Sequence, residues 1–252
     1  MEIKNNHVVD MSGHDTFVFV HGAWSGAWSW DKVRPLLEAL GHTTYAVDLP
    51  GHGEDSSDIA TQTGDTFARK VVDLIESLPC RVILVGNSMG GSVISRVGEM
   101  IPDKIKKIVY LAAFLLQDGE SGNGIDGSGI QPVDWLKDSD DGKTALRHPP
   151  EIPDWMTPEQ AEEEREREAR RKPRESIAAL SGKVHVTKKR WGSIRRYYIH
   201  CTEDECIEPA LQIHMLENLP CRKVYVMKAG HTPHYYQPEA VSVILHDVAL
   251  DI

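Results

Sequence analysis

One serine lies in the only Gly-x-Ser-x-Gly pattern of this 252-residue chain, Gly86-Asn87-Ser88-Met89-Gly90. A serine hydroxyl is a weak nucleophile and needs a base within hydrogen-bond reach. An apolar run precedes the pattern at residues 81–86, and a helical run follows it at 91–101. This strand–turn–helix context is typical of a nucleophilic serine held in a strained turn between glycines. The pattern therefore predicts acyl transfer by Ser88 rather than an incidental glycine-rich turn.

The base predicted to serve Ser88 is His231. It comes shortly after the apolar run 223–227, which places it at the C-terminal edge of a strand, where ligands meet open α/β sheets. His234, three residues further on, is the alternative base. No set of histidines has the spacing of metal ligands, so we expect no metal.

The acid that orients the base is expected after the preceding strand, residues 196–200. Four carboxylates follow that strand closely: Glu203, Asp204, Glu205 and Glu208. We predict Asp204, because a short side chain suits holding one imidazole tautomer. Glu203 is its rival, and Asp118, which follows the strand ending near residue 114, is a more distant alternative.

Acyl transfer also needs hydrogen-bond donors aimed at the oxyanion. One is the backbone N–H of Met89, directly after the nucleophile. The N–H of Ala23, in the loop after the first strand, best provides the other, and Gly22 permits the close backbone approach. Around this centre we expect a substrate site formed by Gly22 and four tryptophans: Trp24, Trp28, Trp135 and Trp155. The alternative is that these tryptophans pack in the core or at the hinge of a cap and do not contact the substrate.

The elements that must position these residues follow from hydrophobic periodicity. Six short β-branched runs predict strands at residues 16–21, 43–49, 81–86, 107–114, 196–200 and 223–227. Several are apolar almost throughout, as parallel strands covered on both faces are. Amphipathic segments at residues 33–40, 67–78 and 238–248 lie between or after them. The alternation predicts a doubly wound, mostly parallel α/β sheet.

This alternation breaks between residues 117 and 194. We therefore predict a core made of residues 1–116 and 195–252, with a helical cap inserted at 117–194. Residues 159–172 alternate in charge, and only Ala161 and Ala169 are apolar there. We expect a solvated helix with i,i+4 pairs Glu163–Arg167 and Glu166–Arg170.

Composition limits the class of partner. The net charge of −10 argues against nucleic acid and anionic membranes, which need a basic patch. No apolar stretch is long enough to span a bilayer, and residues 1–15 lack an export signal, so we expect a cytoplasmic protein. Four scattered cysteines are too few for a disulfide scaffold and are expected to be core or near-core thiols. The apolar content allows a homodimer without requiring one.

Five segments together resemble α/β-hydrolases. They are residues 17–30 (FVFVHGAWSGAWSW), 48–53 (DLPGHG), 86–91 (GNSMGG), 201–207 (CTEDECI) and 230–238 (GHTPHYYQP). The resemblance is narrowest to the branch that contains plant methyl esterases, hydroxynitrile lyases and bacterial small-ester hydrolases. It implies an α/β-hydrolase fold with a Ser88–Asp204–His231 triad, an oxyanion hole from Ala23 and Met89, and no cofactor. Glu208 departs from it, since relatives often carry proline there.

The resemblance predicts a serine carboxylic-ester hydrolase that acts on a small, largely apolar ester, with methyl and aromatic esters among the candidates. The similar lyases carry a threonine after the strand-end histidine and a lysine after the catalytic histidine, where this chain has Gly22 and Thr232. With no cation next to His231 in the sequence, ester hydrolysis is favoured. A lyase, a lactone- or C–C-cleaving enzyme on the same triad, and a ligand-binding protein with a vestigial triad are the alternatives.

Overall fold

Six parallel strands form the central sheet, in the order β2-β1-β3-β4-β7-β8. The computed structural model describes residues 14–125, 135–148 and 157–251. The strands are β1 (Thr16–Val20), β2 (Thr43–Val47), β3 (Val82–Ser88), β4 (Ile105–Ala113), β7 (Arg195–Cys201) and β8 (Lys223–Met227). Each of the six runs predicted from the sequence forms one of them. The predicted doubly wound, mostly parallel α/β sheet is therefore confirmed.

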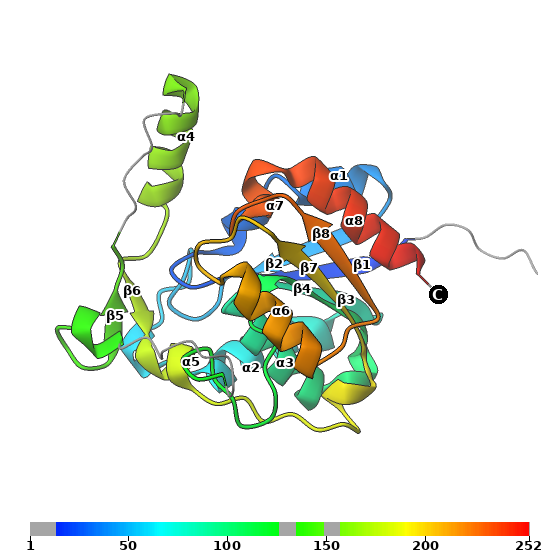
Figure 1. Cartoon of the computed structure of the whole chain (residues 1–252), viewed down its shortest axis with the longest axis horizontal. Coiled ribbons are helices and arrows are strands. Elements are labelled where there is room, and N and C mark those ends of the chain that lie inside the picture. The colour runs from blue at the N-terminus through cyan, green and yellow to red at the C-terminus, as the bar shows by residue number, and fades with distance from the viewer. Residues whose placement is uncertain (1–13, 126–134, 149–156, 252) are drawn as a thin grey trace, which may run out of the picture.

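Helices cover both faces of this sheet (Figure 1). One face packs against α2 (Gly64–Ser77), α3 (Gly90–Met100) and α6 (Pro209–Asn218), and the other against α1 (Arg34–Ala39) and α8 (Pro238–Leu250). The apolar stripe predicted on α2 is buried, and a Thr63–Thr66 capping box fixes where that helix begins. No helix in the described part of the chain is long and apolar enough to cross a membrane.

The insertion between β4 and β7 adds two short antiparallel strands and two helices. They are β5 (Thr144–Leu146), β6 (Arg174–Ser176), α4 (Pro158–Ala169) and α5 (Ile177–Ser181). In Figure 1, β5, β6 and α4 lie to one side of the main sheet. A short helix that the sequence did not predict, α7 (Pro233–Tyr236), follows β8. The remaining short elements are 3₁₀ helices at Ala27–Trp30, Ile59–Thr61, Pro102–Lys104, Trp135–Asp138 and Trp191–Ser193.

The expectation that the charged helix would be solvated is wrong for one face of α4. Glu164 and Arg167 are buried, with relative exposures of 4% and 8%. The Tyr236 hydroxyl of α7 bonds to Glu164. The predicted i,i+4 pairs are also not the ones formed, since Glu163 pairs with Lys32 and Arg170 with Asp31. Tertiary partners from the core therefore replace the partners that the helix alone would offer.

Candidate active site

Ser88 is the last residue of β3 and has a φ of +56°, a left-handed conformation that L residues rarely adopt. Such a conformation costs about 1–2 kcal/mol for a non-glycine residue, so the surrounding structure must impose it. Helix α3 begins two residues later at Gly90. The strand therefore turns sharply at Ser88, as the sequence pattern predicted.

Glycines allow this turn because backbones pass closely on both sides of it. A Cβ at Gly86 would lie 2.7 Å from the Gly90 carbonyl oxygen, and one at Gly90 would lie 2.8 Å from the Val20 oxygen. A Cβ at Gly91 would lie 2.5 Å from the carbonyl oxygen of Phe114. These distances are shorter than side chains tolerate, so each position requires glycine.

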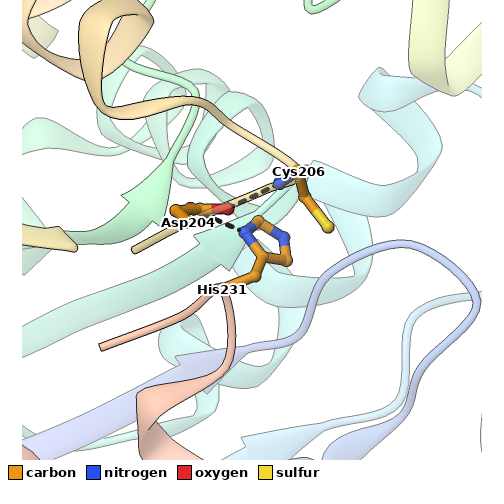
Figure 2. A group of neighbouring side chains, drawn as sticks. All are labelled: Asp204, Cys206 and His231. Atoms are coloured by element: carbon orange, nitrogen blue, oxygen red, sulfur yellow. Dashed lines mark hydrogen bonds and ion pairs between the residues drawn. The ribbon is translucent and has the colours of Figure 1, made fainter. Parts of the chain in front are cut away.

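His231 follows β8 and is hydrogen-bonded to Asp204, which follows β7. The distance from His231 Nδ1 to Asp204 Oδ2 is 2.9 Å (Figure 2). The buried Asp204 carboxylate also accepts bonds from the backbone N–H groups of Cys206 and Ile207 and from Gln212 Nε2, at 2.8, 3.0 and 3.0 Å. These donors fix the orientation of the carboxylate, and the carboxylate in turn bonds Nδ1 of the imidazole, which leaves Nε2 as the nitrogen that can face Ser88.

The alternative acids and the alternative base lie in different surroundings. Glu203 is exposed and lies 3.6 Å from Lys228, and Asp118 is exposed and pairs with His185. His234 is buried against the Trp30 ring, with 4.4 Å between the ring centres. Burial, together with the nearby charge of His231, lowers the pKa of His234 to about 3. A permanently neutral His234 is poorly suited to serve as the base.

Two residues that the sequence analysis did not single out support this arrangement. The side-chain amide of Asn87 donates to the Leu111 carbonyl at 2.9 Å and to the His231 carbonyl at 3.1 Å. Asn87 thereby joins the serine turn to the histidine loop. The fully buried Gln212 of α6 bonds to Asp204 and to the Ile207 carbonyl. Asn87 lies inside the serine pattern and could have been noticed, whereas nothing in the sequence marks Gln212.

The loop after β1 lies beside Ser88. A Cβ at Gly22 would lie 2.9 Å from the Ser88 Cβ, which leaves no room for a side chain there. Buried His21 shapes this loop, because its Nε2 accepts the Leu49 N–H at 3.2 Å and its Nδ1 bonds to the Gly22 carbonyl at 2.7 Å. Burial holds the pKa of His21 well below its usual value, so its ring is neutral. Trp24 has a φ of +56°, and its backbone N–H donates to the Glu175 carboxylate at 3.0 Å.

A cavity of about 650 Å³ brings most of the predicted site residues together. Its lining includes Gly22, Ala23, Trp24, Trp28, Ser88, Met89 and His231. Asp204 lies behind His231 rather than in the lining. Trp135 is the first residue of a 3₁₀ helix and only its backbone is described, and Trp155 lies outside the described residues.

Cations also line this cavity, which the sequence analysis did not predict. Arg147, Arg167 and Arg171 are all part of the lining. Arg167 Nη1 donates to the hydroxyl of Thr232, the residue after His231, at 3.3 Å. His231 therefore has no cation next to it in the sequence, but in the folded chain Arg167 bonds to the residue after it and lines the same cavity.

Two of the four cysteines are exposed, contrary to the expectation of core or near-core thiols. Cys80 and Cys206 are exposed, whereas Cys201 is buried and Cys221 is half-buried. Cys206 lies beside the imidazole of His231 (Figure 2) and lines the cavity. Although Cys206 as a whole residue is exposed, the protein around its thiol desolvates it, and this desolvation and the charge of Asp204 raise the pKa of Cys206, so it remains a neutral thiol at pH 7.

Asp204, Cys206 and His231 are the one group of three potential metal ligands found in the described ranges, with ligand atoms within 4.8 Å of one another. The Asp204 carboxylate already accepts four N–H bonds. A metal ion would have to break the Asp204–His231 bond. The donor set therefore fits a buried, oriented carboxylate better than a metal ligand.

The fold and this turn–histidine–carboxylate geometry define the class of protein. A family model described as the alpha/beta hydrolase family matches residues 17–243, and the chain belongs to that family. Within the family it falls in the branch that contains methylesterases and related enzymes, as the sequence resemblance predicted.

Relatives of the branch match most of the chain. Methylesterase 2 of Arabidopsis thaliana is 32% identical over 90% of this chain and 92% of its own length. The crystal structure of methylesterase protein MES16 from Arabidopsis superposes with a TM-score of 0.75 at 27% identity, covering 93% of this chain and 98% of that one. Two other curated relatives from Arabidopsis thaliana, both with "chloroplastic" in their names, are longer. This chain spans 63% and 60% of their length at 32% identity.

Proposed function

We propose that this protein is a serine esterase that hydrolyses small carboxylic esters through an acyl-enzyme. The observation that carries the proposal is Ser88 at φ +56°, lining the same cavity as a histidine bonded to a buried carboxylate. Relatives named methylesterase support ester hydrolysis as the reaction. We also propose that residues 117–194 form a cap over a core of residues 1–116 and 195–252. A cytoplasmic location remains a prediction from the sequence.

In the proposed reaction Ser88 attacks the acyl carbon while His231 takes the hydroxyl proton. Asp204 stabilises the imidazolium that forms. The N–H groups of Ala23 and Met89 stabilise the oxyanion of the tetrahedral intermediate. His231 then protonates the leaving alcohol, and water activated by the same imidazole releases the acid. The residues in these roles need no metal or organic cofactor.

Ester hydrolysis is favoured over cyanohydrin cleavage by the space around Gly22. The lyases that resemble this chain bind the substrate hydroxyl with a threonine at this position. Here a Cβ would already lie 2.9 Å from Ser88, so the chain offers neither that hydroxyl nor room for it.

The test measures hydrolysis of 4-nitrophenyl butyrate by variants of Ser88, His231 and His234. Ser88→Ala and His231→Ala should each lower kcat by about a thousandfold or more, because members of a triad act as one unit. His234→Phe keeps the aromatic contact with Trp30 and should retain activity within about tenfold, because a neutral, buried imidazole transfers no proton. Unchanged hydrolysis by Ser88→Ala would refute the proposal. Release of benzaldehyde from mandelonitrile above the uncatalysed rate would favour the lyase.

A further inference from the structure

The cavity beside Ser88 is apolar on most sides and positively charged on one. The side chains of Trp24, Met89 and Phe114 are part of the apolar lining. The charged side carries the guanidinium groups of Arg147, Arg167 and Arg171, all from the segment between β4 and β7. Two carboxylates, Glu164 and Glu168, pair with these arginines, and neither belongs to the lining. Asp138 is a third carboxylate and does belong to the lining, where it pairs with His148. Of the carboxylates that pair with the three arginines, none lines the cavity, so the arginines present their positive charge to it.

Arg167 has unused donor capacity. It is buried, Nη2 pairs with Glu164, and Nη1 bonds to Thr232. Its Nε has no hydrogen-bond partner among the residues that the structure describes. The rings of Tyr235 and Tyr236 lie 4.9 and 5.2 Å from the guanidinium carbon and hold it in place. The Nε itself is enclosed by protein, so it is the charge of the guanidinium, in a residue that lines the cavity, that favours an anionic ligand there.

Arg171 extends the same charged surface toward the predicted oxyanion hole. Its Nε bonds to Glu168 at 3.1 Å, and its Nη1 lies 3.5 Å from the carbonyl oxygen of Ala23. Burial, together with the positive charges of Arg167 and Arg147, lowers the pKa of Arg171 to about 10. Arg171 remains charged at pH 7, but its neighbours do not neutralise it fully. An anion beside these side chains would relieve that repulsion.

The position of the arginines limits how far the anionic group of a substrate can lie from its scissile ester bond. Arg167 contacts the residue after His231, and Arg171 contacts the loop that carries Ala23. Both therefore lie within a few ångströms of the residues proposed to perform the reaction. An anionic group bonded to them would belong to the same small molecule as the scissile ester.

We propose that Arg167 and Arg171 form a carboxylate-binding subsite, so that the preferred substrate is an ester carrying a second, ionised carboxyl group. This inference rests on the proposed function, because it names the substrate class of the same site. Guanidinium groups suit the role, since their planar N–H forks match a carboxylate. The apolar remainder of the cavity would hold the carbon skeleton between the two carboxyl groups.

The experiment compares matched neutral and anionic esters. 4-Nitrophenyl hexanoate and mono-4-nitrophenyl adipate differ by a terminal methyl against a carboxylate on the acyl side. Phenyl acetate and 4-acetoxybenzoate differ by a carboxylate on the alcohol side. We expect one anionic ester of the two pairs to show a kcat/KM at least tenfold above its neutral partner. The pair that shows it identifies the half of the substrate that carries the charge.

The variants tie that preference to the arginines. Arg167→Met and Arg171→Met should each lower the anionic-to-neutral ratio by about tenfold, mainly through KM. Arg167→Lys, which keeps the charge but loses the fork, should lower the ratio by less. The matched control is Arg165→Met. Arg165 lies on α4 with Arg167, but it is exposed and does not line the cavity. This variant should leave the ratio unchanged.

Two outcomes separate this inference from the proposed function. Ser88-dependent hydrolysis with no preference for either anionic ester, or with ratios unchanged in both methionine variants, would overturn the subsite and leave the esterase intact.

If none of the four esters is hydrolysed, the esterase proposal fails, and a binding measurement then tests the subsite. Monomethyl adipate or 4-hydroxybenzoate should bind Ser88→Ala protein about tenfold more tightly than the Ser88→Ala, Arg167→Met double variant by calorimetry. Equal affinity for both ligands would overturn the subsite.

Discussion

At the scale of single residues, the site depends on a strained backbone conformation at Ser88 and on the side-chain hydrogen bonds that surround it. Ser88 has a left-handed backbone conformation, and its neighbour Asn87 donates both amide hydrogens to carbonyl groups of other segments. One of these carbonyls belongs to Leu111 of β4 and the other to His231. The serine turn and the histidine loop are therefore positioned by one amide group, which makes Asn87 a positioning residue.

Replacing Asn87 by aspartate tests this role. A carboxylate of nearly the same shape cannot donate to the two carbonyl oxygens and would repel them. We expect Asn87→Asp to lower kcat by about 10–100-fold and the free energy of unfolding by about 1–3 kcal/mol. Steady-state kinetics and urea titration measure the two effects. Asn218→Asp, at the exposed end of α6, is the control for kcat and should leave kcat unchanged, although it loses the bonds of the Asn218 amide to His214. Wild-type kcat in Asn87→Asp would contradict the positioning role.

At the scale of elements, the sequence predicts strands and helices well where burial repeats with a regular period. All six main strands follow apolar runs, and most of the apolar residues that recur with a 3.6-residue period in α2 and α8 are buried. The turn at Ser88 is predictable as well, because the glycines at 86 and 90 on either side of the serine mark it in the sequence. In each case the information lies within about 15 residues of sequence.

Elements whose burial depends on distant partners could not be predicted in this way. Helix α4 has almost no apolar residues, yet Glu164 and Arg167 are buried because Tyr236 and Thr232 reach them from about 70 residues away. The same holds for Cys206, which follows β7 and lies against a histidine that follows β8. Local periodicity carries no information about such contacts. The charged side of the cavity therefore emerges only from the three-dimensional structure.

The buried pair His52–Glu175 links β6 to the loop after β2. Glu175 accepts bonds from His52 Nε2 at 2.7 Å and from the Trp24 N–H at 3.0 Å. Burial alone would lower the pKa of His52, but the charge and hydrogen bond of Glu175 outweigh it and raise that pKa above 6.5. The folded state therefore binds the His52 proton more tightly than the unfolded state does.

This pair predicts a pH dependence of stability. Its contribution is fully present below about pH 6.5 and is lost as the pH rises through the raised folded-state pKa. Glu175→Gln should be less stable at pH 6 by about 1–3 kcal/mol, and the difference from wild type should shrink toward pH 9. Urea unfolding of both proteins at pH 6, 7, 8 and 9 measures this. A difference that is constant or grows with pH would show that the pair does not carry the effect.

At the scale of the whole molecule, the segment between β4 and β7 is joined to the core on more than one side. Near the active site, the Lys172 N–H donates to the Trp24 carbonyl at 3.1 Å, and Glu175 accepts the Trp24 N–H. On the face covered by α2 and α3, buried Arg96 donates to the carbonyls of Gly182 and Lys183 at 2.8 and 2.7 Å. Such bonds couple the segment to the core, so the two should unfold together.

Arg96 is where this coupling can be tested. Besides its two bonds to residues 182–183, Arg96 pairs with Asp65 at 3.1 Å and bonds to the Ser92 carbonyl at 3.1 Å. Arg96→Met keeps the length of the side chain but leaves these acceptors without their donor. We expect a loss of about 3 kcal/mol and a fall in Tm of about 6–12 °C, within one cooperative transition. Scanning calorimetry measures both, with the exposed Arg69→Met of α2 as a control that should leave Tm within about 1 °C. Two separate transitions, of which Arg96→Met moves only the first, would instead show that the inserted segment unfolds independently of the sheet.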